Sequence, residues 1–67
     1  MIIFLEMNQT ELPENDTVGL TVRLPVESKE AALALRDELA TRFFAGVAYT
    51  SQLHTHNTDA PCEVEPL

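Results

Sequence analysis

Two histidines near the end of the chain, His54 and His56, are the residues best placed to do chemistry. On a β-strand, alternate residues face the same side, so both imidazoles can reach one ion. Asp59 and Cys62 follow closely and would complete a four-ligand zinc site. The segment lacks the CxxC and HxxxH spacings of established zinc sites, so two solvated histidines at the end of an edge strand are the simpler interpretation. We therefore expect no cofactor, and we keep a metal-binding module at His54 and His56 as an alternative function.

A catalytic role is not indicated. Cys62 and a histidine can form a nucleophile and base pair, but such a pair also needs an orienting group, an oxyanion hole and a pocket. A chain of 67 residues has little scope for a water-excluding pocket. The only glycines are Gly19 and Gly46, so there is no glycine-rich phosphate loop. We expect a protein that is not an enzyme.

Acidic side chains gather in two segments that contain no Lys or Arg. The formal net charge is −7, from 11 acids and 4 bases, and the bases all lie in the middle of the chain. We predict that six of these acids bind a partner. They are Glu11, Glu14 and Asp16 in the first segment and Asp59, Glu63 and Glu65 in the second. Direct binding to nucleic acid or to an anionic membrane is disfavoured, because both need Lys and Arg.

The charge distribution favours a protein partner with a basic surface. If the two acidic segments converge, their carboxylates would imitate the phosphates that a nucleic-acid-binding protein recognises. The main hypothesis is therefore a small inhibitor or adaptor, a nucleic-acid mimic that blocks a basic groove. In size and charge the chain is similar to small acidic inhibitors, including the anti-CRISPR proteins of phages. That similarity carries over no residues. The alternative is that the acids only maintain solubility.

A second alternative function is self-association through the outer face of a helix. Four residues lie on the side opposite the expected core face, namely Leu33, Asp37, Ala40 and Phe44. Apolar side chains exposed there would form a seam between copies or a surface for another partner. Phe44 curling under the helix end and an ordinary exposed Leu33 would explain the same pattern.

The chain shows local patterns for three strands and one helix. We expect strands over residues 2–7, 17–24 and 47–53, a helix over residues 29–45, and a short fourth strand near residues 62–64. The second strand alternates apolar and polar residues with period two. Ser28 is the expected N-cap, and Gly46 the expected left-handed stop. The expected core face of the helix carries Ala31, Ala32, Leu35, Leu39 and Phe43.

These elements predict an α+β fold of the order β-β-α-β, with one helix packed on a sheet of three or four strands in two layers. We expect one domain over residues 1–56, followed by an acidic, proline-containing segment (57–67) that is a tail or a short edge strand. The strand order stays open between a parallel crossover and a split βαβ arrangement. One free cysteine and the absence of a basic, apolar leader favour the cytoplasm.

Overall fold

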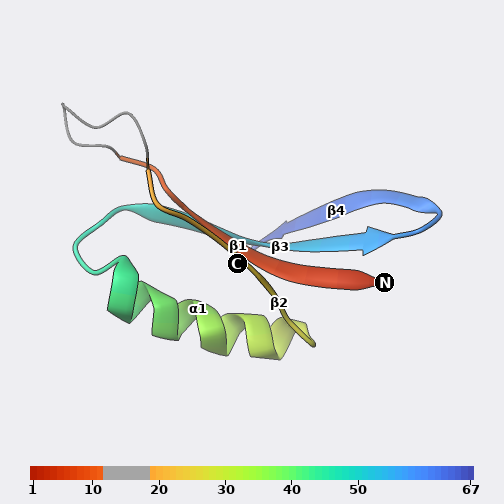
Figure 1. Ribbon diagram of the computed structural model, residues 1–67, viewed down its shortest axis with the longest axis horizontal. Coiled ribbons are helices and arrows are strands. Elements are labelled where there is room, and N and C mark those ends of the chain that lie inside the picture. Colours follow the sequence, from red (N-terminus) through yellow and green to blue (C-terminus); the bar gives the residue numbers. More distant parts are fainter. Residues whose placement is uncertain (12–18) are drawn as a thin grey trace.

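The computed structural model describes residues 1–11 and 19–67. Five elements follow one another along the chain. They are β1 (Ile2–Gln9), β2 (Thr21–Pro25), α1 (Lys29–Phe43), β3 (Tyr49–Asn57) and β4 (Ala60–Pro66). The predicted α+β class with two layers is confirmed, since one helix packs on one face of a four-stranded sheet (Figure 1).

The sheet has the order β2-β1-β3-β4, and every neighbouring pair is antiparallel. β1 therefore separates the two strands that flank the helix, which decides in favour of the split βαβ arrangement. β3 runs further than expected and includes both histidines. The last segment of the chain forms the edge strand β4, whereas the sequence left open a flexible tail or a short edge strand.

The helix begins at the N-cap expected from the sequence, and the expected left-handed glycine lies in the turn that follows its end. The Ser28 hydroxyl accepts a hydrogen bond of 3.1 Å from the amide of Ala31, which satisfies one free donor of the first turn. Gly46 has a φ of 73°, a left-handed conformation that an L residue with a Cβ adopts only with strain. The helix ends at Phe43, two residues before the predicted end, and Phe44 is its C-cap.

The core lies between α1 and the two central strands. Among residues 1–11 and 19–67, six buried side chains form it, namely Leu5, Met7, Ala32, Leu39, Phe44 and Leu53. The sequence prediction for the helix end is wrong, because Phe43 is 57% exposed whereas Phe44 is 2% exposed. The reason is the C-cap. Phe44 leaves helical geometry, with φ −115° and ψ 13°, and its ring packs against Tyr49 at a centroid distance of 5.2 Å.

The predicted outer stripe of the helix is not a free apolar surface. Phe44 belongs to the core, and Ala40 packs against it. Of the remaining two stripe residues, Leu33 is half-buried and Asp37 is exposed. The prediction of an exposed Phe44 is therefore wrong, and the simpler interpretation of that residue holds.

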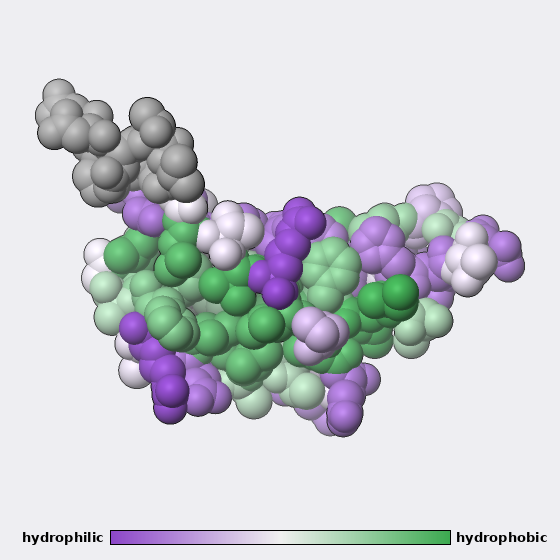
Figure 2. Space-filling view, viewed as in Figure 1, coloured by the Kyte–Doolittle hydropathy of each residue, from purple (hydrophilic) through white to green (hydrophobic). Residues whose placement is uncertain are grey.

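The two faces of the sheet differ. Figure 2 shows apolar side chains gathered between the sheet and the helix. The other face, which we call the open face, has no helix or strand of the described residues packed on it (Figure 1). In residues 1–11 and 19–67 no helix has the length and hydropathy needed to cross a membrane.

Candidate metal centre

Strand pairing assembles a cluster of side chains on the open face. His54 and His56 lie two residues apart on β3, so both side chains point to the same side. In the sheet register, Phe4 of β1 lies opposite His54 on one side, and Val64 of β4 lies opposite it on the other. Cys62, two residues before Val64, therefore shares this face and comes close to both imidazoles.

The three donor atoms have the spacing of a transition-metal site. Cys62 Sγ lies 3.3 Å from His56 Nε2 and 3.8 Å from His54 Nδ1. All three atoms lie within 4.8 Å of one another. With Zn–S and Zn–N bonds of about 2.3 and about 2.0 Å and tetrahedral angles, donors on one zinc ion are about 3.5 Å apart. The two sulfur–nitrogen distances bracket that value, whereas the ligand atoms of the two histidines are bounded only at 4.8 Å, so closing on an ion moves the imidazoles toward each other.

A buried carboxylate lies behind His54. Glu6, which is 6% exposed, places Oε1 3.2 Å from His54 Nε2. Asn8 and Gln52 donate to the same oxygen, at 3.2 and 2.7 Å. An ionised Glu6 keeps the proton of a neutral His54 on Nε2, which leaves Nδ1 free to coordinate. Metal-binding histidines are oriented by carboxylates in this way.

Glu6 is held in its ionised form. Burial on its own raises the pKa of the Glu6 carboxyl, but hydrogen bonds from Asn8, Arg23 and His54, together with the charge of Arg23, outweigh burial and lower the pKa to about 2. Arg23 Nε donates to Glu6 Oε2 at 2.5 Å. The Glu6 carboxylate is therefore a permanent anion on the β1 side of the cluster at neutral pH.

Aromatic stacking fixes the histidine rings. The ring of Phe4 stacks on His54 with a centroid distance of 4.6 Å and an interplanar angle of 6°, and on His56 with 5.4 Å and 11°. Arg23 Cζ lies 5.8 Å from the centroid of the Phe4 ring. Two rings held by the same neighbour lose little rotational freedom when they bind an ion, which favours binding.

The residue pattern indicated the histidines and Cys62 but not Glu6 and Phe4. A usable signal existed, because Glu6 is the one charged residue in the otherwise apolar run of the first strand. Charged side chains are almost never fully buried without a partner. A partner for Glu6 was therefore to be expected, although the sequence could not say which one. Asp59, proposed as a ligand, lies in the turn between β3 and β4 and is not part of the donor cluster.

The described acids of the two predicted acidic segments do not converge. Glu11 follows the end of β1 that pairs with Tyr49, whereas Asp59 lies beyond the opposite end of β3. Glu65 is on the helix side of β4 and pairs with Lys29. Glu63, two residues before Glu65, faces the same way. Glu14 and Asp16 lie outside the described residues.

Every basic side chain of the protein has an acidic partner. The pairs are Arg23–Glu6, Lys29–Glu65, Arg36–Asp37 and Arg42–Glu38. Because the sequence contains only four Lys and Arg, none of them remains free to bind an anion. Within residues 1–11 and 19–67, no ion pair involves Glu11, Asp59 or Glu63. The unpaired charge of the folded chain is therefore negative.

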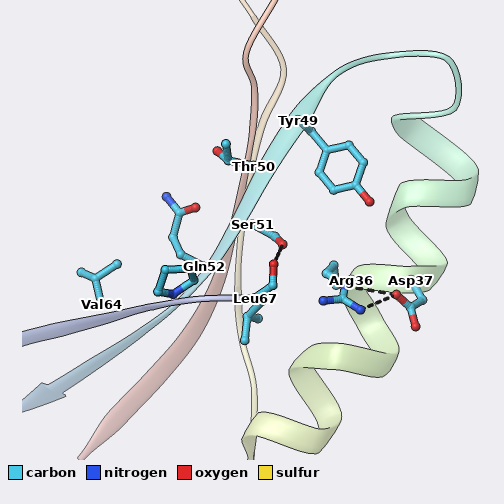
Figure 3. A pocket seen from close by; sticks show the side chains of 9 residues that line it. Arg36, Asp37, Tyr49, Thr50, Ser51, Gln52, Val64 and Leu67 are labelled. Atoms are coloured by element: carbon cyan, nitrogen blue, oxygen red, sulfur yellow. Dashed lines mark hydrogen bonds and ion pairs between the residues drawn. The ribbon is translucent and has the colours of Figure 1, made fainter.

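A pocket of about 680 Å³ lies where β4 ends beside the helix (Figure 3). The Ser51 hydroxyl donates to the carbonyl oxygen of Leu67 at 3.0 Å on its wall. Arg36 is already paired with Asp37, and the other side chains that line the pocket are uncharged at neutral pH. The pocket contains no constellation of reactive groups, so the open face remains the better candidate site.

Comparisons of the chain with protein-family models, with curated proteins and with solved structures find no match.

Proposed function

We propose that this protein is a small metal-binding module that holds a transition-metal ion, of the class of Zn²⁺ and Cu⁺, on the open face of its sheet. The observation that carries the proposal is the convergence of His54 Nδ1, His56 Nε2 and Cys62 Sγ within 4.8 Å. Imidazole and thiolate ligands suit zinc and copper, whereas magnesium and calcium prefer oxygen ligands. The chemistry of the donors thus selects the class of ion.

The second shell supports the same proposal. Glu6 and Phe4 hold His54 from two directions, one by a charged hydrogen bond and the other by stacking. We infer a binding role rather than a catalytic one, because two of the three donors, His56 and Cys62, are exposed.

Titration with Co²⁺, a substitute for zinc that absorbs visible and near-ultraviolet light, tests the proposal. We expect one ion per chain and a near-ultraviolet absorption band from thiolate-to-cobalt charge transfer. Replacement of one ligand, Cys62→Ser, should remove that band and weaken Zn²⁺ binding by more than about 100-fold, since even the loss of an outer-shell partner costs about 10–100-fold. Competition with a chromophoric chelator measures the zinc affinity. The same competition with Cu⁺ under reducing conditions identifies the preferred ion.

Asp59→Asn provides the matched control. Asp59 is close in sequence to the donors but outside their cluster, so its variant should bind Zn²⁺ as the wild type does. Absence of the charge-transfer band in the wild type would refute the proposal. Equal zinc affinity in Cys62→Ser and the wild type would refute the assigned ligands.

A second candidate function is docking to a basic protein surface, the inhibitor or adaptor role expected from the sequence. It is supported by the pairing of all four Lys and Arg side chains, while Glu11, Asp59 and Glu63 have no ion pair within residues 1–11 and 19–67. Such a surface attracts a basic partner over a range of about 8 Å at physiological ionic strength.

Salt-dependent capture tests the docking role. Tagged protein should retain a basic, nucleic-acid-binding protein from a lysate and release it at moderate salt, since exposed charges are screened. We expect the triple variant Glu11→Gln, Glu14→Gln and Asp16→Asn to release that protein at a lower salt concentration. Release of the partner from both proteins at the same salt concentration would exclude these three acids from the interface.

A further inference from the structure

The donor cluster does not complete the coordination of a zinc ion. It has three members, His54, His56 and Cys62, and the described residues contribute no fourth Asp, Glu, His or Cys within the same reach. Structural zinc sites have four protein ligands, whereas sites with three keep one position open. Because His56 and Cys62 are exposed, that open position lies at the surface of the molecule.

Apolar side chains flank the cluster on both sides. Ile2 lies opposite His56 in the sheet register and is 65% exposed. Val64 lies opposite His54 on the other side and is 55% exposed. An exposed apolar border around polar anchor residues is typical of a protein interface, in which it excludes water from the anchors.

Charge and symmetry indicate which protein covers the cluster. A divalent ion bound by one thiolate leaves a net charge of about +1 at the site, on a chain whose own net charge is −7. The site then attracts an anionic ligand, and the Cys62 thiolate of a second copy, although bound to its own ion, keeps lone pairs with which it can bridge to this one. In a two-fold interface, residues near the axis meet their own equivalents. Two copies whose two-fold axis passes beside Cys62 therefore bring the Cys62 of each one to the site of the other.

We propose that metal binding joins two copies of this chain through their open faces, and that the Cys62 thiolate of each copy bridges its own ion and the ion of the other. This inference rests on the proposed metal-binding function. Without an ion, two chains of charge −7 repel each other, so association depends on the ion. The surface used for self-association is then the open face and not the helix stripe.

Light scattering during size-exclusion chromatography tests the inference. With one equivalent of Zn²⁺ the mass should be twice the 7.5 kDa of one chain, and with a chelator it should return to 7.5 kDa. The Co²⁺ absorption spectrum is recorded on the same samples. It reports binding independently of mass, so failure of the metal-binding function and failure of pairing are distinguished.

Two variants locate the interface. The double variant Ile2→Thr and Val64→Thr keeps all three donors and the β-branched shape that suits strands. It should bind one Co²⁺ per chain. The dissociation constant of its dimer should be at least about tenfold higher than that of the wild-type dimer. Cys62→Ser should remain a monomer with Zn²⁺.

Each contrary outcome identifies what is wrong. A wild-type monomer that binds one Co²⁺ per chain would overturn the inference and keep the metal site. A dimer that persists in chelator, or that forms with Zn²⁺ in Cys62→Ser, would also overturn it. Absence of Co²⁺ binding would overturn both the inference and the function on which it rests.

Discussion

Replacement of Phe44 by alanine is expected to unfold a large fraction of the protein at room temperature. The side chain is 2% exposed and is among the largest that the core buries. Truncation of a buried phenylalanine to alanine costs about 3–5 kcal/mol, through lost burial and the cavity that remains. A domain of this size usually has a total stability of about 3–5 kcal/mol, so the loss is comparable with the whole.

Phe43→Ala is the matched control, because it makes the same chemical change one residue earlier in the chain. Phe43 is 57% exposed, so we expect the Phe43→Ala substitution to change the free energy of unfolding of the protein by less than about 1 kcal/mol. Urea titration followed by far-ultraviolet circular dichroism measures both variants. The reverse result, with Phe43→Ala the more damaging variant, would mean that the helix presents to the sheet the face predicted from the sequence.

Replacement of Glu6 by glutamine is expected to give the second-largest effect, and one that depends on pH. The pKa of Glu6 in the folded chain is about 2, below its ordinary value of 4.5. Between these values the unfolded chain binds more protons, so the free energy of unfolding rises with pH. The Glu6 contribution is complete above the ordinary value and is lost as the pH falls through about 2. Its size is about 3 kcal/mol, at 1.36 kcal/mol for each pH unit.

Urea unfolding of the wild type and Glu6→Gln across this pH range, in the presence of a chelator, measures that contribution. The other carboxyl groups titrate in both proteins, so the difference between the two curves isolates Glu6. We expect the difference to be largest at neutral pH and to shrink as the solution is acidified. Parallel curves would show that the Glu6 carboxyl is not ionised preferentially in the folded state.

The same variant also tests the support that Glu6 gives to His54 in the proposed metal site. Glutamine can still accept from His54 Nε2 through its amide oxygen, but it lacks the charge that keeps the proton on that nitrogen. We expect Zn²⁺ affinity to fall by about 10–100-fold, the usual cost of losing an outer-shell partner of a ligating histidine. The affinity is measured at neutral pH on protein that circular dichroism shows to be folded.

The sequence alone determined the local structure of this protein. The alternation of apolar residues before Pro25 predicted a strand, the serine before Lys29 predicted the helix start, and Gly46 predicted a left-handed residue near the helix end. All three features are present in the structure. These features can be predicted from the sequence because each depends on residues only a few positions apart. The strand depends on the alternation of side chains between two faces, and the helix ends depend on capping residues. Together they sufficed for the α+β class.

Only the tertiary structure decided which residues meet. Cys62 approaches the two histidines because β4 pairs with β3, and Glu6 approaches His54 because β1 pairs with β3 on the other side. The same pairing places Glu11 and Asp59 at opposite ends of the sheet. Strand order and register depend on the combined packing and hydrogen bonding of the whole sheet, which no short window of sequence contains. The burial of Phe44 in place of Phe43 has the same origin, because turning the chain toward Tyr49 selects which ring enters the core.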